Sequence, residues 1–349
     1  MSAPGVTGGR LPDDKLTAGD IVPAIEFADA SGHKIDLNSD DIAGHFQILL
    51  FAADGSADLV RPFADRLAEF AELDGRTWLV RSPSSRLKPV AGLTVLVDQQ
   101  GALDRLFGAA PAVGAAKAVV IGPNQHLIAV LNSTDGDLLD QVEEILTRRA
   151  PSRRTADMDI HPPVLLVPDV LSPADCRNLM SIYTMRGNEF VPPGHMALEG
   201  RTTDCKMYVD DYGREDRVDH WVIEQDTNQL LDKRLAGRLF PEIRRAFQYN
   251  VTRREHYRIA TYTGERRGEP HGHRDNSEEL VAHRRFAMTI NLNSENYQGG
   301  AIRFPEFGDQ RYRPPSGAAI VFSSSLLHEV LEVEGGRRFG LLAFLFGES

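Results

Sequence analysis

The pattern of apolar residues changes partway along this 349-residue chain. Up to about residue 150, apolar runs of strand length alternate with segments of helical periodicity, which is typical of an α/β layer structure. From about residue 255, short apolar runs are separated by Gly, Pro and Asn, which favours a sandwich or barrel. Because domains average roughly 150 residues, a chain of this length is expected to hold about two. We therefore predict two domains of different fold class, residues 1–150 and 164–349.

The first domain is predicted to be a small α/β sandwich. The helix expected over 57–73 carries one apolar face, made of Leu59, Val60, Phe63, Leu67 and Phe70. The other elements are strands over 45–53, 76–82 and 93–98, a hairpin over 117–131 and a closing helix over 136–149.

The second domain is predicted to be α+β, with helices packed against a β-barrel-like core. Residues 151–163 are polar, charged and proline-bearing, and are expected to link it to the first domain. A strand and a helix follow over 164–185, with Ser172 as the N-cap and Pro173 in the first turn. A second helical region is expected over 227–247. The run FAMTINL (286–292) then alternates apolar residues with the period of a strand.

Composition excludes several classes of protein. The net charge of -11 argues against general binding to nucleic acids or anionic membranes, whose phosphates attract basic surfaces. Two cysteines, Cys176 and Cys205, are too few for a disulfide scaffold or a cysteine zinc site, and neither is expected to be catalytic. The start, MSAPGVTGGRLPDD, lacks the apolar core of a secretory signal, and no apolar run approaches the roughly 20 residues of a membrane span. We expect a cytoplasmic protein without a membrane segment.

A candidate metal site lies in EPHGHRDNSEE (269–279). His273 and Asp275 are separated by one residue, so on a strand their side chains would share a face. His328, which follows the apolar run GAAIVF, is the candidate third ligand. Two histidines and one carboxylate form the facial triad of non-haem iron(II) oxygenases. The alternative is that these residues are ordinary loop polarity, and His271 is assigned to the pocket rim or to solvent.

A basic residue with a defined use follows the third ligand. Arg338 stands ten residues after His328, at the start of the last apolar strand. A guanidinium near a metal suits a dicarboxylate, because it can donate two parallel hydrogen bonds to the carboxylate that does not chelate the ion. Arg337 is the neighbouring rival, and it is expected to point to the opposite face of the strand.

Residues from about 164 to the end resemble the prolyl 4-hydroxylase branch of the iron(II)- and 2-oxoglutarate-dependent dioxygenases. The resemblance implies a double-stranded β-helix, or jelly roll, with buttressing helices. The segments that carry it, in order, are DVLSPADCRNLM, YRIATYTGERRGEPHGHRD, INLNSENYQGGAIRFPEFG, GAAIVFSSSLLHEVLEV and RRFGLLAF.

The resemblance implies a role for each matched residue. His273, Asp275 and His328 would hold Fe(II), and Arg338 would bind the distal carboxylate of 2-oxoglutarate. Tyr262 stands where family members place a tyrosine hydroxyl on the co-substrate, and a core tyrosine is the alternative. The implied reaction consumes 2-oxoglutarate and O2, with ascorbate as an accessory reductant, releases succinate and CO2, and hydroxylates a C–H bond. Because Asp275 is present, no ligand position is vacated for halide.

The first domain resembles the thioredoxin-like fold, and more closely the peroxiredoxins. LTAGDIVPAIEFADASGHKIDLNS (16–39) is similar to their opening hairpin, and HFQILLFAADGSADLVRPF (45–63) spans the turn where the peroxidatic cysteine lies. However, residues 1–150 contain no cysteine, and a thiolate is the required nucleophile. The usual proline before the third strand is also missing. We therefore expect a structural, dimerising or partner-docking role, with a homodimer as one possibility, and no peroxidase activity.

The leading interpretation is a dioxygenase that hydroxylates a small-molecule or peptidyl substrate, such as a prolyl residue or an amino acid. The alternative is a non-catalytic sensor or interaction protein that keeps the metal and 2-oxoglutarate pocket. The loops that would select a substrate follow no readable pattern. The candidate residues for binding an anionic group of the substrate are Arg201, Lys206, Arg284 and Arg285.

Overall fold

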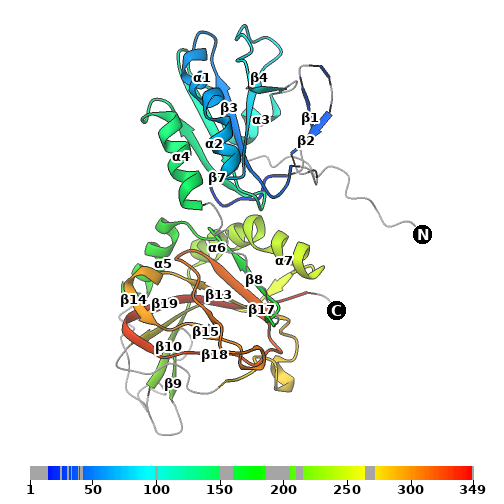
Figure 1. Ribbon diagram of the computed structural model, residues 1–349. Helices are drawn as coiled ribbons and strands as arrows, with labels where there is room; N and C mark the ends of the chain where they lie inside the picture. Colours follow the sequence, from blue (N-terminus) through cyan, green and yellow to red (C-terminus); the bar gives the residue numbers. More distant parts are fainter. Residues whose placement is uncertain are drawn as a thin grey trace, which may run out of the picture. The chain divides into compact units, whose positions relative to one another are not determined.

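Figure 1 shows the computed structural model of the chain. It describes residues 15–23, 26–29, 31–32, 34–37, 39, 42–98, 101–149, 160–185, 205–209, 215–263 and 272–347, with the backbone alone for 26–27, 205–209 and 215–219. The chain divides into two compact units, Met1–Thr155 and Ala156–Ser349. Residues 151–159 of the predicted linker lie outside the described residues.

The N-terminal unit is built on one mixed sheet with the strand order β2-β1-β5-β4-β3-β6-β7. Strands β3, β4 and β5 are parallel, whereas β6 and β7 run antiparallel to their neighbours. This arrangement is that of a thioredoxin-like fold, so the predicted fold class is confirmed. The strands are β1 (Glu26–Asp29), β2 (Lys34–Asp36), β3 (Phe46–Ala52), β4 (Gly75–Arg81), β5 (Thr94–Val97), β6 (Ala116–Ile121) and β7 (Leu127–Asn132).

Both faces of this sheet are covered, which explains the uninterrupted apolar sequence of the central strand β3. Helices α1, α2 and α4 pack on one face and α3 on the other. Their bounds are α1 (Ala57–Asp65), α2 (Leu67–Glu72), α3 (Ala102–Phe107) and α4 (Leu138–Arg149). The sequence prediction missed α3, a short helix whose first N–H groups are bound by the Asp98 carboxylate.

The single helix predicted over 57–73 is wrong, because the segment forms two helices that meet at Arg66. This residue has φ -109° and ψ 9°, outside the helical range, and its guanidinium pairs with Glu69 and with Glu143 of α4. The predicted apolar face is correspondingly incomplete: Leu59 is 39% exposed, whereas Val60, Phe63 and Phe70 are buried.

The C-terminal unit contains a large and a small sheet. The large sheet has the order β8-β17-β13-β19-β12-β10-β9, with β11 and β14 also paired to β19, and the small one has the order β16-β15-β18. The strands are β8 (Val164–Val167), β9 (Cys205–Val209), β10 (Glu215–Trp221), β11 (Arg253–Arg254), β12 (Arg258–Thr263), β13 (Phe286–Asn291), β14 (Tyr297–Gly299), β15 (Ile302–Arg303), β16 (Arg311–Tyr312), β17 (Ala319–Ser323), β18 (Glu329–Val330) and β19 (Val333–Phe346).

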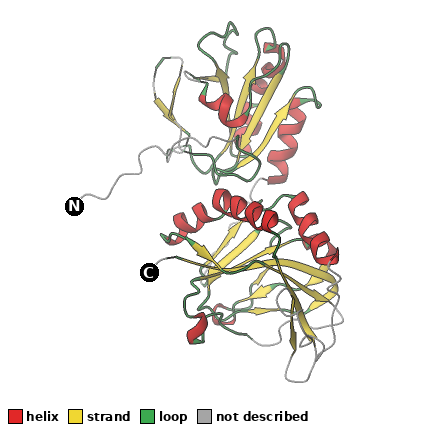
Figure 2. Cartoon of the chain, turned by 180° about the vertical axis from the view of Figure 1, so that it is seen from behind, coloured by secondary structure: helices red, strands yellow, loops and turns green. Residues whose placement is uncertain are grey.

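Three helices cover one face of the large sheet, as Figures 1 and 2 show. They are α5 (Pro173–Met185), α6 (Gln225–Arg238) and α7 (Phe240–Phe247), with three short 3₁₀ turns elsewhere, η1 (Glu279–Val281), η2 (Ser294–Asn296) and η3 (Pro305–Phe307). The start of α5 confirms the predicted cap, because the Ser172 hydroxyl accepts the N–H of Asp175 at 3.1 Å and donates to its carboxylate.

The other face of the large sheet packs against the small sheet. Tyr262 and Phe322 of the large sheet share a buried cluster with Ile302, Phe304 and Val330 of the segments that form the small sheet. Two sheets with an apolar core between them and helices on one outer face form the predicted jelly roll, which is confirmed. Along β13, Phe286, Met288 and Ile290 face the helices, so Ala287, Thr289 and Asn291 face the interior of the jelly roll.

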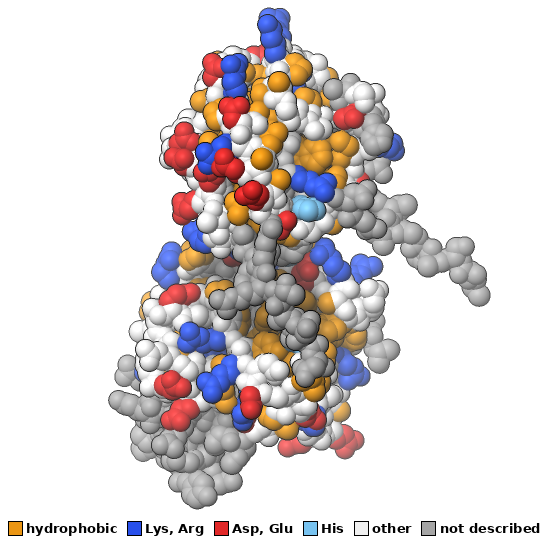
Figure 3. Space-filling model, viewed as in Figure 1, with side chains coloured by type: hydrophobic (Ala, Val, Ile, Leu, Met, Phe, Trp, Pro, Cys, Tyr) orange, Lys and Arg blue, Asp and Glu red, His pale blue; other side chains and the backbone are white. Residues whose placement is uncertain are grey.

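Among the described helices, none has the length and apolar character needed to cross a membrane. On the face shown in Figure 3, acidic and basic side chains are interspersed over both units.

Candidate metal centre

Two segments that are distant in sequence carry the predicted metal ligands. His328 lies directly before β18, and His273 forms an isolated antiparallel bridge with it. The N–H of His273 donates to the carbonyl of His328 at 2.9 Å, and the return bond is 3.1 Å. The N–H of Asp275 donates to the carbonyl of Ser324, just after β17, at 2.9 Å. We call residues 272–276 the H-x-D segment; beyond this bridge it is not a strand.

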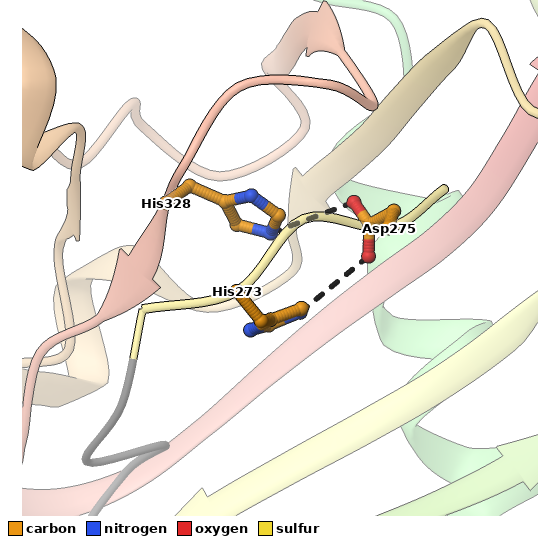
Figure 4. A group of neighbouring side chains, drawn as sticks. All are labelled: His273, Asp275 and His328. Atoms are coloured by element: carbon orange, nitrogen blue, oxygen red, sulfur yellow. Dashed lines mark ion pairs between the residues drawn. The ribbon is translucent and has the colours of Figure 1, made fainter. Parts of the chain in front are cut away.

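The three side chains nevertheless point toward one another (Figure 4). Nε2 of His273 lies 3.5 Å from Oδ1 of Asp275, and Nε2 of His328 lies 3.5 Å from Oδ2 of the same carboxylate. One ligand atom from each residue lies within 4.8 Å of the others. Since metal–ligand bonds of about 2.1 Å place neighbouring ligand atoms about 3 Å apart, a small inward movement would let all three bind one ion.

The surroundings of His328 orient its ring. Nδ1 lies 3.0 Å from the carbonyl oxygen of Leu326, which favours a proton on Nδ1 and leaves the lone pair of Nε2 directed at Asp275. The ring packs 4.6 Å from that of Phe322, and only 7% of the side chain is exposed. His273 is 41% exposed, so the site is closed on the side of His328 and open on the side of His273.

Asp275 is a buried carboxylate that remains charged. Burial acts to raise its pKa, but the contacts with His273 and His328 and the charge of Arg284 outweigh burial and hold the pKa below its ordinary value. Its Oδ2 atom is buried without a hydrogen-bond partner, since the approach of His328 has the distance of an ion pair but not the geometry of a hydrogen bond. A buried charged oxygen without a donor is costly, and a cation between these ligands would satisfy it.

Arg338 lies in the interior of the jelly roll, and two of its guanidinium nitrogens have no hydrogen-bond partner. It pairs with Tyr262 in the β12–β19 register, and its guanidinium lies 5.1 Å from the centre of the Tyr262 ring. Arg338 is 3% exposed; Nη2 reaches Asn291 Oδ1 at 3.4 Å, while Nε and Nη1 have no hydrogen-bond partner. A buried guanidinium with two unused donors is suited to a carboxylate. As predicted, Arg337 points to the opposite face, where it lies 6.0 Å from the Phe339 ring.

Sequence reasoning missed two polar residues on the same interior face. Thr289 has a buried hydroxyl without a hydrogen-bond partner, and Asn291 holds Arg338. Gly340 keeps space open beside them, because a Cβ there would lie 3.5 Å from the Thr289 hydroxyl. The alternation in FAMTINL contains the signal: if the apolar residues face the helices, the threonine and asparagine must face the interior.

The structure gives different answers for the other polar residues singled out from the sequence. His271 and Arg201 lie outside the described residues, and Lys206 is described by its backbone alone. Arg285 is exposed and donates to the carbonyl of Ala282 at 2.8 Å.

Arg284 is fully engaged within the protein, which argues against a role in holding an anionic substrate. Its guanidinium forms two hydrogen bonds to the Glu255 carboxylate, of 2.6 and 2.8 Å, and donates to the main-chain carbonyl of Asp275 at 3.1 Å. It also lies 3.7 Å from the centre of the Phe344 ring. Arg284 therefore fixes the backbone of a candidate ligand.

The Glu255–Arg284 pair predicts a dependence of stability on pH. Burial acts to raise the pKa of Glu255, but the hydrogen bonds and charge of Arg284 outweigh it, so the pKa lies below its ordinary value of 4.5. The stabilisation is therefore fully present above about pH 4.5 and is lost as the pH falls through the lowered pKa. We expect Glu255→Gln to lower the urea midpoint at pH 7, and the difference from the wild type to shrink below pH 4.5. A difference that does not change with pH would contradict this.

In the N-terminal unit, Ser56 is the hydroxyl-bearing residue of the turn after β3. It is 3% exposed, and its hydroxyl lies within hydrogen-bonding distance of the carbonyls of Ala53 (2.7 Å) and Ala115 (3.0 Å). Both neighbours are carbonyl oxygens, which accept a hydrogen bond but are too weakly basic to remove the proton of the hydroxyl. The turn that carries the nucleophile in peroxiredoxins is thus occupied by a structural serine.

Solved structures similar to parts of the chain include a Pseudomonas putida prolyl-4-hydroxylase, 20% identical over 54% of this chain and 94% of that chain, with a TM-score of 0.39. The viral collagen prolyl hydroxylase of Paramecium Bursaria Chlorella virus-1 is 14% identical over 53% and 96%, with a TM-score of 0.38. Xanthomonas campestris Peroxiredoxin Q is 14% identical over 37% and 96%, with a TM-score of 0.30.

No curated protein matches the sequence of the chain. Residues 257–346 match the family model of the 2OG-Fe(II) oxygenase superfamily, and this range contains the three candidate ligands, Tyr262 and Arg338. The family implies Fe(II), 2-oxoglutarate and O2 as cofactors, and the two-histidine, one-carboxylate set fits the iron. Residues 257–346 of this chain are therefore identified as a 2OG-Fe(II) oxygenase domain.

Proposed function

We propose that this chain hydroxylates a C–H bond of a prolyl, amino-acid or related small or peptidyl substrate, with conversion of 2-oxoglutarate and O2 to succinate and CO2. The observation that carries the proposal is the convergence of His273, Asp275 and His328, in the same jelly roll as a buried Arg338 with two unused donors. Both features leave buried polar atoms without hydrogen-bond partners, which a bound cation and a bound carboxylate would satisfy.

Each residue has a distinct task in this proposal. His273, Asp275 and His328 would hold Fe(II), which when bound supplies the activation of O2 that the protein cannot. Arg338 would bind the distal carboxylate of 2-oxoglutarate through N–H groups of its guanidinium, while Asn291 accepts a hydrogen bond from Nη2. The Tyr262 ring would support the guanidinium and present its hydroxyl to the co-substrate.

Aromatic side chains would keep the closed side of the site dry. Phe322 lies 4.6 Å and Phe304 6.4 Å from the ring of His328, and both are buried. Excluding water on this side strengthens the charge-assisted hydrogen bonds of the pocket and directs oxidation toward a bound substrate. The substrate would enter on the side of His273, the exposed ligand.

The N-terminal unit would contribute no redox chemistry, because it has no cysteine and its Ser56 is bound to two carbonyl groups. We propose a docking or dimerising role for it, with residues 1–150 as this module and residues 164–349 as the oxygenase.

The experiment is to measure succinate release from 2-oxoglutarate by the purified full chain with Fe(II) and ascorbate in air. We expect slow release without added substrate, because many sites of this kind turn over weakly when O2 reaches the metal. Release should stop when EDTA is added or when O2 is removed, because the reaction requires the metal and consumes O2. The measurement is succinate per enzyme over time.

Two other outcomes are informative. No succinate, with Fe(II) and 2-oxoglutarate both still bound, would favour the non-catalytic sensor and would be followed by a screen of prolyl peptides and amino acids. Failure to bind either Fe(II) or 2-oxoglutarate would refute the proposed function, and the H-x-D segment would then be a polar loop.

A further inference from the structure

The H-x-D segment has little backbone support. It belongs to neither sheet, and its backbone bonds to other described residues are the two of the His273–His328 bridge and the one from Asp275 to Ser324. All of these lead to the segment that carries His328, residues 324–330. Ligands must be held within about 0.5 Å of their working geometry for a metal to bind well. Side chains must therefore help to fix the two segments.

Arg274, the residue between the two ligands His273 and Asp275, is one such side chain. It forms a bidentate ion pair with Glu306 of η3, with Nη2–Oε1 and Nη1–Oε2 distances of 2.7 and 3.2 Å. Nη1 also donates to the carbonyl of Ser325. The guanidinium is therefore bound both to η3 and to the segment that leads to His328.

Glu306 completes the connection from the other side. Its Oε2 atom accepts the N–H of Leu327, the residue before His328, at 3.0 Å. The hydrogen bonds from Arg274 and from that N–H hold the pKa of Glu306 below its ordinary value, so the carboxylate stays charged. One carboxylate thus binds the residue between two ligands and the residue next to the third.

We propose that Arg274 and Glu306 form a bracket that positions the three metal ligands and sets the affinity of the site for its metal. The proposal rests on the proposed function, since it concerns the same metal site. Both side chains are on the surface, 40% and 39% exposed, and such pairs contribute little to folding stability. Groups that orient metal ligands, by contrast, change metal affinity about 10–100-fold. The bracket should therefore influence metal binding much more than stability.

A neighbouring ion pair, made by Arg303, differs from the bracket in the segments that it connects. Arg303 of β15 binds Glu329, the residue after His328, and Asp309 at 2.9 Å. That pair fastens the His328 segment to the small sheet, and both carboxylate partners of Arg303 lie outside the H-x-D segment. Among the described residues, the bracket is the ion pair that joins residues adjacent to all three ligands.

The test is a titration of the full chain with Co(II), followed by its visible absorption, which reports metal binding without turnover. The variants are Arg274→Gln, Glu306→Gln and the double variant, with Arg274→Lys as the conservative change. The control is Arg245→Gln, which removes another surface arginine, 52% exposed against 40% for Arg274, that pairs with Glu242 on α7. Urea midpoints are measured for every variant.

We expect Arg274→Gln and Glu306→Gln each to raise the Kd for Co(II) about tenfold. The Kd of the double variant should be no higher than that of either single variant, because each substitution alone already breaks the same ion pair. Arg274→Lys should lie between them and the wild type. Urea midpoints should change no more than in Arg245→Gln, whose Kd should equal that of the wild type.

A Kd unchanged in both single variants would overturn the bracket while leaving the proposed function intact. The bracket would also be wrong if every variant that binds Co(II) more weakly also has a clearly lower urea midpoint than Arg245→Gln. The weaker binding would then be explained by a less stable fold. If Arg274→Gln alone raises the KM for an added substrate and leaves the Kd unchanged, Arg274 binds substrate and the bracket is wrong. A wild-type chain that binds no Co(II) would refute both the bracket and the proposed function.

Discussion

Asp275→Ala is expected to abolish succinate release and to weaken metal binding by more than about a hundredfold, since changes to groups that only orient ligands already cost 10–100-fold. The substitution removes the carboxylate that lies 3.5 Å from both histidines. Without it, two neutral imidazoles remain, and the ion loses its only charged ligand in the set. The measurements are succinate release with Fe(II) and the Kd for Co(II).

The matched control for this variant is Asp309→Ala. Asp309 belongs to the same unit, is 93% exposed and pairs with Arg303, so its removal changes the net charge equally without touching the candidate ligands. We expect Asp309→Ala to retain wild-type release and affinity. Asp275→Ala should also retain a cooperative urea transition, because a buried carboxylate with an unpartnered oxygen stabilises the fold little. Wild-type turnover in Asp275→Ala would exclude the assigned iron site.

Arg338→Met is expected to raise the KM for 2-oxoglutarate by about a hundredfold or more. Hydrogen bonds to charged groups are worth about 1.5–3 kcal/mol each, and the variant removes the charge-assisted hydrogen bonds that the guanidinium would donate to the distal carboxylate. Methionine keeps much of the apolar stem, and the Kd for Co(II) should stay unchanged because the metal ligands are untouched. The measurement is succinate release as a function of 2-oxoglutarate concentration, beside Co(II) titration.

Arg337→Met is the control for that variant. Arg337 precedes Arg338 on β19 but points to the helix-covered face, so the change in charge is the same while the pocket keeps its guanidinium. We expect its KM to equal that of the wild type. Equal effects of the two substitutions would show that the lost charge, and not a bond to the co-substrate, is responsible.

Much of the fold and the candidate site could be predicted because the relevant signals are local. The period of two in FAMTINL defines which residues of β13 face the helices, and the same alternation separates Arg337 from Arg338. His273 and Asp275 are two residues apart, so their proximity needs no knowledge of the tertiary structure. His328 was chosen as the third ligand from its place after the apolar run GAAIVF and then from the family resemblance, because nothing in its spacing fixes a contact across 53 residues, the difference between 328 and 275.

The features that could not be predicted depend on partners that are distant in sequence. Arg284 looked available for a substrate anion, yet its partner Glu255 lies on the other side of the H-x-D segment in the chain. Arg274 and Glu306 are each ordinary charged residues until η3 brings them together. The break at Arg66 likewise involves Glu143 of α4, which no local periodicity contains.

The two halves of the candidate site differ in how firmly the backbone holds them: Arg338 lies on strand β19, whereas two metal ligands lie on the H-x-D segment. Strand β19 pairs with β11, β12, β13 and β14, and Arg338 pairs with Tyr262 of β12, whereas the H-x-D segment is held by one bridge, one further backbone hydrogen bond and a few side chains. Segments with few backbone bonds open at lower free energy than central strands. Local opening would therefore release the metal while the anchor for 2-oxoglutarate stays folded. Iron loss on mild heating would then be reversible, because the ligand segments can close again on an intact scaffold.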